Sequence, residues 1–355
     1  LKRVNMRRAL FGLALCQINV GLNAPIPLCS KSAPCKRLLA TYAFQDPPKT
    51  LLTSASTKPQ CRTGKKGIHA GHERFDDGPP KTWTDADGTI RYYCLYQPQK
   101  SKSAKRPLLL YFPGSGGSAQ SLYDFTQFRT HAAEFVLVSV QARNLHWPTT
   151  LSDQEGTKFD TFYRDFAKNA DVAFVDAIID KLVGEGTVDP SRIYLSGWSN
   201  GGRFATFYGI TRYETPTPGK NRIAAVATYS SGDPFENIDH SVEPSCQQNP
   251  YPKSNLPILM ISRSCDLIAC SHQQANHLGV RGTAIPPGNI ASVWITRLRE
   301  ITPRSKWLKL DDHAALVTEC APDDDCGMFK ALRNHIRWPT NREKEMLEFL
   351  QLYRR

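Results

Sequence analysis

One serine of this chain stands where a covalent nucleophile could be held. In the segment LSGWSNGG, Ser199 lies between Gly197 and Gly201, and Gly202 follows. A serine hydroxyl attacks a carbonyl carbon only when a base takes its proton and when donors stabilise the oxyanion that forms. A G-x-S-x-G sequence on a sharp turn between a strand and a helix exposes a serine for this chemistry. The alternative is a glycine-rich turn with no catalytic role.

A second glycine-rich segment could supply donors for the oxyanion. YFPGSGGSAQ, at 111–120, overlaps the end of the apolar run 107–112. In hydrolases with such an elbow, one donor is the backbone N–H after the nucleophile and the other comes from a loop after an earlier strand. We therefore assign the two donors to the N–H groups of Ser115 and Asn200. The alternative is that these glycines only allow tight packing.

The base and its orienting acid are expected later in the chain. Asp266 follows the apolar run 256–262, and Asp233 in SSGDPFEN is its competitor. His335 in RNHIRWP is expected in the loop that leads into the last helical pattern, and His313 in KLDDHAAL is the alternative base. We favour Asp266 and His335, because serine, acid and histidine then follow in the chain order of this class of triad.

Three tryptophans could wall an acyl pocket with aromatic surface. Trp198 precedes the serine, Trp338 follows the histidine, and Trp147 is expected in the loop after the strand predicted at 135–142. Tryptophans are also ordinary core residues, so packing is the alternative for each of them.

The elements that must position these residues alternate between strands and helices. SRIYLSGWS predicts a strand that runs straight into the elbow. Continuous apolar runs are typical of strands buried on both faces, and they occur at 107–112, 135–142, 222–230 and 256–262. Helical spacing of apolar residues is found at Val172, Val175, Ile179 and Leu182. The pattern predicts an α/β-hydrolase fold, with a mostly parallel central sheet, helices on both faces and active groups at the carboxyl ends of strands.

Both ends of this region carry their own signals. TWTDADGTIRYYCLYQP predicts two strands joined at the Asp87-Gly88 turn. TNREKEMLEFLQLYRR predicts a final helix that starts with a capping box of Thr340 and Glu343. The apolar face expected of that helix consists of Met346, Leu347, Leu350 and Leu352.

Positive charge is concentrated ahead of the folded body. The chain of 355 residues has a net charge of +12, and residues 1–72 hold twelve Lys and Arg against one acid. The remaining 283 residues hold 33 basic and 32 acidic groups. A nearly neutral body without a basic stripe argues against nucleic-acid binding. We predict a targeting segment and disordered basic linker at 1–65, and a catalytic domain at 66–355.

The N-terminus and the cysteines favour an exported protein, secreted or periplasmic. MRRALFGLALC resembles a signal peptide that starts at Met6, and an organellar transit peptide is the alternative. No apolar run approaches the ~18 residues of a membrane span. The ten cysteines form no C-x-x-C or zinc-type spacing, so we expect disulfides and no metal. The pairs considered are Cys61 with Cys94, Cys320 with Cys326, and Cys246 with Cys265 or Cys270.

Several segments together resemble the polyhydroxybutyrate depolymerase and feruloyl esterase group of α/β-hydrolases. They are RYYCLYQP, YFPGSGG, DVAFVDAIIDKL, VDPSRIYLSGWSNGG, SCDLIAC and HIRWP, and the likeness spans about 83–352. The resemblance implies hydrolysis of carboxylic esters through an acyl-enzyme, without metal or organic cofactor. The substrate would be a polyester such as polyhydroxyalkanoate, or a feruloyl or acetyl-type ester. The chain departs from the group at Pro113-Gly114, where His-Gly is usual, and at RSCD, where His-Gly-x-x-Asp is more usual.

Two other classes of function are considered beside the esterase. One is a serine peptidase of the same fold, which is disfavoured because no gating domain is expected ahead of the hydrolase body. The other is a non-catalytic binding module on a hydrolase scaffold. The complete set of Ser199, Asp266 and His335 argues against such a module. No pattern in the sequence sets an oligomeric state.

Overall fold

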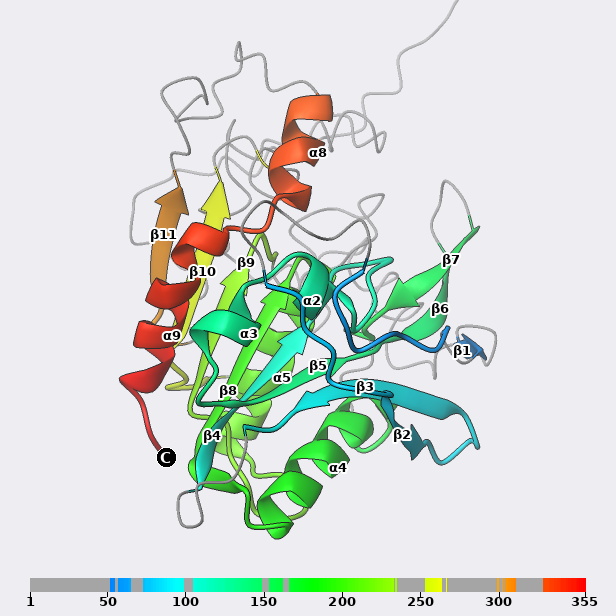
Figure 1. The fold of residues 1–355 in the computed structure, drawn as a ribbon, viewed down its shortest axis with the longest axis vertical. Coiled ribbons are helices and arrows are strands. Elements are labelled where there is room, and N and C mark those ends of the chain that lie inside the picture. Colours follow the sequence, from blue (N-terminus) through cyan, green and yellow to red (C-terminus); the bar gives the residue numbers. More distant parts are fainter. Residues whose placement is uncertain are drawn as a thin grey trace, which may run out of the picture.

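A twisted eight-stranded sheet forms the centre of the protein (Figure 1). The structure is a computed structural model, and its strand order is β11-β10-β9-β8-β4-β5-β3-β2. It describes residues 52–54, 57–64, 73–98, 105–148, 153–161, 166–232, 234, 253–263, 266, 299, 302, 304–310 and 328–355. The strands of this sheet are β2 (Lys81–Thr84), β3 (Ile90–Tyr96), β4 (Arg106–Phe112), β5 (Val136–Val140), β8 (Val188–Trp198), β9 (Ala225–Tyr229), β10 (Ile258–Arg263) and β11 (Lys306–Leu310).

The strands expected from apolar runs all lie in this sheet, and neighbours from β5 to β11 pair in parallel. β2 and β3 form the expected antiparallel hairpin, with Thr84 opposite Ile90 at its turn end. β3 continues the sheet by pairing antiparallel with β5. The mostly parallel sheet of an α/β-hydrolase is therefore confirmed, and the hairpin forms its antiparallel end.

The direction of chain progression reverses at β4. β5 lies on one side of β4, and β8, β9, β10 and β11 follow in chain order on the other side. Ligands of open α/β sheets bind outside the carboxyl ends of the strands at such a switch point. The loops that follow β4 and β8 leave the sheet there, and they carry the two glycine-rich segments.

Helices cover both faces of the sheet, and each face has its own core. α4 (Ala170–Gly184) and α5 (Asn200–Glu214) pack against Leu108, Leu110 and Phe112 of β4. α2 (Ser121–Asp124), α3 (Phe128–His131) and α9 (Glu343–Gln351) pack against the opposite face. The apolar positions predicted for α4 are all buried. Asn169 starts this helix, because its Oδ1 accepts from the N–H groups of Asp171 and Val172.

The chain enters the fold earlier than the sequence indicated. β1 (Leu52–Ser54), β6 (Arg143–Pro148) and β7 (Asp153–Lys158) form a separate small sheet. Cys61 is buried and is bonded to Cys94 of β3. Residues 52–54 and 57–64, which lie ahead of the predicted boundary at residue 65, thus make contacts with the folded body, and the boundary itself stays a prediction. The predicted signal segment and the other cysteines lie outside the described residues.

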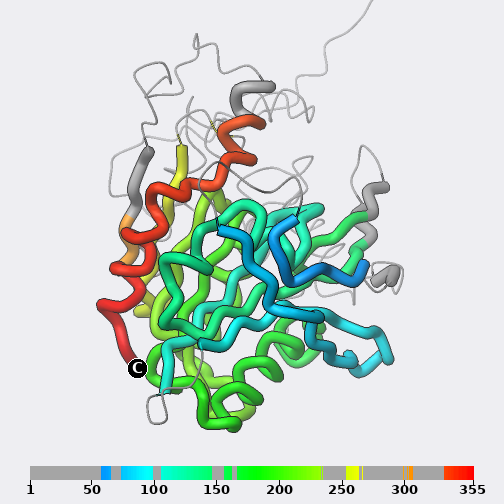
Figure 2. The backbone as a smooth tube through the Cα atoms, in the orientation of Figure 1, coloured from blue at the N-terminus to red at the C-terminus, as the bar shows by residue number. Residues whose placement is uncertain are grey.

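The final helix starts differently from its prediction. Thr340–Arg342 forms a short 3₁₀ turn, and α9 begins at Glu343 without a side-chain cap. The predicted capping box is wrong, because the Glu343 carboxylate turns into the core and accepts from the backbone N–H of Gln127. Leu352 is exposed, and Phe349 is buried in the helix face instead. Arg355, at the end marked C in Figure 2, lies beside the start of β8. Its N–H donates to Ser191 O over 3.0 Å.

Candidate active site

Ser199 stands on a strained turn between β8 and α5. Its backbone angles, φ of 53° and ψ of −121°, lie in a region that residues other than glycine rarely adopt. β8 ends one residue before it and α5 begins one residue after it. The predicted strand–elbow–helix arrangement is therefore present in the structure. The N–H of Ser199 donates to Tyr229 O over 3.0 Å, which ties the elbow to the neighbouring strand β9.

Two glycines make the elbow sterically possible. A Cβ atom on Gly201 would lie 2.1 Å from Phe112 O and 2.3 Å from Pro113 O. A Cβ atom on Gly197 would lie 2.5 Å from Gly201 O. Any larger residue would push the first turn of α5 away from the end of β4.

The structure brings the three predicted catalytic side chains together. His335 Nε2 lies 2.9 Å from Ser199 Oγ, and His335 Nδ1 lies 3.1 Å from Asp266 Oδ1. Asp266 is fully buried, and the histidine side chain is 12% exposed. An imidazole so placed can take the serine proton at one nitrogen while the carboxylate orients the other.

His335 lies on a helix, where the sequence suggested a loop. It occupies the last turn of α8 (Met328–Ile336), between β11 and α9. Carbonyl groups at the end of a helix lack partners inside the helix. Here the carbonyl of Asn334 accepts from the Tyr229 hydroxyl at 2.6 Å, and that of His335 accepts from the Trp198 indole at 2.8 Å. The ends of β8 and β9 therefore hold the end of α8.

The loop after β4 passes directly beside the nucleophile. A Cβ atom on Gly114 would lie 3.3 Å from Ser199 Cβ. Ser115 follows and is exposed. The N–H of Gly116 donates to Thr157 O of β7 at 2.8 Å, which connects the loop to the small sheet. At its far end, the N–H of Ala119 donates to Gln141 Oε1 at 2.6 Å.

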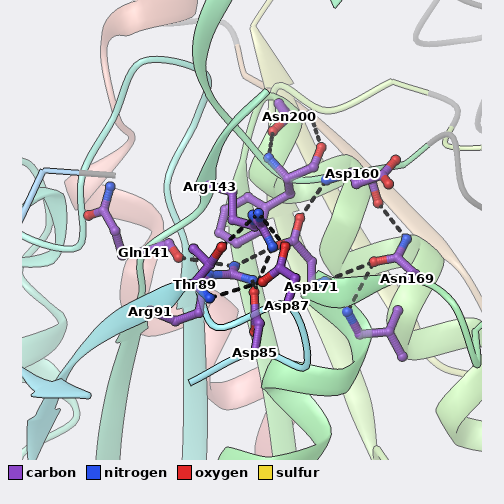
Figure 3. A network of polar contacts seen from close by, with 12 residues as sticks. Asp85, Asp87, Thr89, Arg91, Gln141, Arg143, Asp160, Asn169, Asp171 and Asn200 are labelled. Atoms are coloured by element: carbon purple, nitrogen blue, oxygen red, sulfur yellow. Dashed lines mark hydrogen bonds and ion pairs between the residues drawn. The ribbon is translucent and has the colours of Figure 1, made fainter. Parts of the chain in front are cut away.

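The side chain of Asn200 anchors the start of α5. Its Oδ1 accepts from the N–H of Phe159 at 2.8 Å, and its Nδ2 donates to Phe159 O at 3.2 Å. The next N–H, of Asp160, donates to Asp171 Oδ2 at 2.6 Å (Figure 3). The residue after the nucleophile is thus connected to a buried polar network.

That network extends to the turn of the β2–β3 hairpin (Figure 3). Arg91 pairs with Asp171 and with Asp85, and Arg143 also donates to Asp85, at 3.0 Å. Burial raises the pKa of Asp85, although the charges of Arg91 and Arg143 act in the opposite direction. Buried charges are tolerated when they are paired and hydrogen-bonded in this way.

The tryptophans have packing partners at the site. Trp198 and Trp338 are 8% and 5% exposed, and their rings meet edge to face with centroids 6.2 Å apart. The Trp338 indole donates to Glu343 Oε1 at 2.6 Å. Trp147 lies on the strand β6, so its predicted place in a loop is wrong, and its side chain is outside the described residues. Contact of these tryptophans with substrate stays a prediction. The competing residues Asp233 and His313 also lie outside the described part of the chain.

A further residue at the site was missed by sequence reasoning. Ser230 follows β9, and its hydroxyl contacts both Asp266 and His335. The segment SSG after an apolar strand was the only sequence signal, and it reads equally well as a turn.

Lys158 ends β7 near the first turn of α5. Burial, and next the charge of Arg203, lower the pKa of Lys158 to about 8.

Among the described residues, no group of three or more metal-type ligands gathers. A cavity of about 360 Å³ lies at the amino end of β4, at the opposite end of that strand from the Ser199 elbow, and is lined by Lys105, Arg106, Glu134, Arg192 and Arg354, among others. Within the described part of the chain, no helix is long and apolar enough to cross a membrane.

Comparisons with known proteins find hydrolases. No model of a known protein family matches the chain. A bifunctional acetylxylan esterase/xylanase of Neocallimastix patriciarum is 35% identical over 104 residues, which is 27% of this chain and 14% of that protein. The chain thus spans a small part of that relative.

Solved structures with a related fold share little sequence with the chain. A thermostable esterase is 19% identical, with a TM-score of 0.45, over 79% of this chain and 64% of its own. An S-formylglutathione hydrolase from Agrobacterium tumefaciens is 11% identical, with a TM-score of 0.45, over 77% and 93%. An acylaminoacyl peptidase of Pyrococcus horikoshii is 13% identical, with a TM-score of 0.44, over 77% and 41%. The strand order and the elbow carry the fold assignment.

Proposed function

We propose that this protein is a serine hydrolase of carboxylic esters that works through an acyl-enzyme. The observation that carries the proposal is the contact of 2.9 Å between Ser199 Oγ and His335 Nε2, with Asp266 at the other nitrogen. Ser199 is the nucleophile, His335 the general acid and base, and Asp266 the group that orients the imidazole and stabilises its charged form.

In the first half of the reaction, His335 Nε2 takes the proton of Ser199 as Oγ attacks the ester carbonyl carbon. The carbonyl oxygen becomes an oxyanion, and the backbone N–H groups of Ser115 and Asn200 donate to it. The position of Asn200 at the start of α5 adds the positive end of a helix dipole. Collapse of the intermediate expels the alcohol, which takes its proton from His335. Water then repeats the sequence, and the carboxylic acid leaves.

The substrate class is proposed more narrowly as an acetyl ester of a polysaccharide, a polyhydroxyalkanoate or a feruloyl ester. Acetyl esters of plant-wall polysaccharide come first, because the similar curated protein is an acetylxylan esterase. Polyhydroxyalkanoate and feruloyl esters follow from the motif resemblance. Export of the protein is part of the proposal, and the Cys61–Cys94 disulfide supports an oxidising compartment.

Hydrolysis of p-nitrophenyl acetate tests the reaction. The native protein should release p-nitrophenol, and Ser199→Ala should lose a factor of about 10⁴ in kcat. A fluorophosphonate should label Ser199 in the native chain. Labelling at another residue, or full activity of the variant, would refute the proposal.

A serine peptidase is the second candidate, because the arrangement of Ser199, His335 and Asp266 could also cleave an amide through an acyl-enzyme. The matched p-nitroanilide separates the two, since an esterase leaves this amide intact at enzyme levels that consume the ester. Release of acetate from acetylated xylan, beside release of ferulate and of hydroxybutyrate, then ranks the substrates.

A further inference from the structure

The hydroxyl of Ser230 lies between the acid and the histidine. Its Oγ is 2.7 Å from His335 Nδ1, and 2.8 and 2.7 Å from the two carboxylate oxygens of Asp266. The carboxylate itself approaches Nδ1 only to 3.1 Å. Ser230 is fully buried. The nearest oxygen to Nδ1 is therefore a neutral hydroxyl that also contacts the carboxylate.

The single proton of this hydroxyl decides the state of the imidazole. A carboxylate only accepts hydrogen bonds, so the proton of Ser230 satisfies Asp266 when it points there. Oγ then offers only lone pairs to Nδ1, and Nδ1 must carry the hydrogen that fills the 2.7 Å contact. Nε2 is left bare and can accept the proton of Ser199. The reverse orientation would place the hydrogen on Nε2 and deprive the buried carboxylate of this donor.

The backbone of Ser230 is held in a conformation that favours glycine. Its φ is 49°, and its N–H donates to Ile261 O of β10 at 2.8 Å. A side chain in such a region costs about 1–3 kcal/mol. A glycine would avoid that cost, yet it would remove the hydroxyl. The left-handed turn aims Oγ into the gap between two residues that lie 69 positions apart in the chain.

We propose that Ser230 is a positioning residue that fixes the tautomer of His335, with hydrogen on Nδ1 and a lone pair on Nε2 facing Ser199. The inference rests on the proposed function, because the tautomer matters only if His335 acts as a base. The class of role resembles that of the orienting acid, whose loss leaves the wrong tautomer and lowers kcat sharply.

Nitrogen NMR of histidine-labelled protein tests this role without reference to activity. In the native chain, at a pH where His335 is neutral, the spectrum should show hydrogen on Nδ1. In Ser230→Ala and in Ser230→Gly, the form with hydrogen on Nε2 should become populated. The two variants share the lost hydroxyl, but only glycine relieves the backbone, so agreement between them assigns the effect to the hydroxyl. Ser231→Ala is the matched control, because Ser231 is also fully buried and its Oγ contacts only Thr228 among the described residues.

Rates on p-nitrophenyl acetate complete the test. We expect a loss of about ten- to hundred-fold in kcat for both Ser230 variants, smaller than for loss of an orienting acid because Asp266 remains in contact. KM should stay unchanged, and Ser231→Ala should match the native enzyme. Retention of the Nδ1–H form in both Ser230 variants overturns the inference, whatever the rates. A native protein without esterase activity would instead refute the proposed function, and the spectra would still decide the role of Ser230.

Discussion

The indole N–H of Trp198 donates to the main-chain oxygen of His335 across 2.8 Å. Trp198, which directly precedes the proposed nucleophile Ser199, therefore holds the backbone of His335. The side chain of His335 in turn faces Ser199. This contact gives Trp198 a role that does not depend on substrate, and it leads to a direct experiment.

Trp198→Phe should lower kcat by about three- to ten-fold, because it removes one hydrogen bond, worth about 0.5–1.5 kcal/mol, that fixes the end of α8. Trp338→Phe is the matched control, since its indole donates to Glu343 and not to α8. That variant should lose stability, because it leaves a buried carboxylate short of a donor. Steady-state rates and urea unfolding of both variants check the pair. Equal kcat values for the two variants would contradict the role of the Trp198 indole in holding the end of α8.

His335→Ala should lose nearly all kcat on p-nitrophenyl acetate, while KM changes little, because the imidazole moves protons and the ester binds elsewhere. His313→Ala should stay within a few-fold of the native rate. Circular dichroism establishes that both variants are folded. The reverse ranking would transfer the role of base to His313.

Lys158→Met should stabilise the protein at neutral pH. The pKa of Lys158 in the fold, about 8, lies below the ordinary lysine value of 10.5. The unfolded chain therefore binds a proton that the folded chain releases between these values, and stability rises with pH across this window. The cost of the buried charge is fully present below about pH 8.

The gain for Lys158→Met should thus reach up to about 3 kcal/mol near pH 7 and shrink as the pH rises from about 8 to 10. Urea unfolding of both chains at a series of pH values measures it. Lys181→Met, on an exposed position of α4, serves as the control. A gain that is constant with pH would show that packing, and not charge, is the cause.

Removal of the Cys61–Cys94 bond should destabilise the fold and leave kcat close to native. The bond closes a loop with a sequence separation of 33. Loop closure of this size is worth about 3–4 kcal/mol in the chain-entropy model. The double variant Cys61→Ala and Cys94→Ala should lose this amount of unfolding free energy in urea. Added reductant should lower the stability of the native chain to that of the double variant, because it breaks the same bond.

The same bond sets how far the N-terminus can be shortened. A chain that starts at residue 52 keeps β1 and Cys61, so its stability should equal that of the full chain. A chain that starts at residue 66 lacks both and should be weaker by at least the loss seen for the double variant. Equal stability of the two shortened chains would show that residues 52–65 add nothing to the fold, and it would support the predicted domain boundary at residue 65.

The sequence was most informative where one local rule determines the structure. The buried strands, the hairpin at Asp87-Gly88 and the elbow at Ser199 each depend on residues that are neighbours in the chain. The candidate triad was recognisable because its order and its strand-end positions follow from the topology.

The missed features depend on partners far away in the chain. Glu343 fits a capping box locally, but its carboxylate is buried and accepts instead from the N–H of Gln127, 216 residues earlier. The helical state of His335 depends on carbonyl partners from β8 and β9. Ser230 acquires its role from a left-handed φ that its residue type does not predict, and from contact with Asp266, which lies three positions after the end of β10.

The distance along the chain between Ser199 and His335 has a consequence for refolding. These residues are 136 positions apart, and the contacts that hold α8 span 105 and 137 positions. Contacts of such long sequence separation form late, because the chain between them must be ordered first. Catalytic competence is thus a property of the finished topology. During renaturation, ester hydrolysis should recover after the far-ultraviolet signal of strands and helices, and its lag would time the final docking of the C-terminal segment.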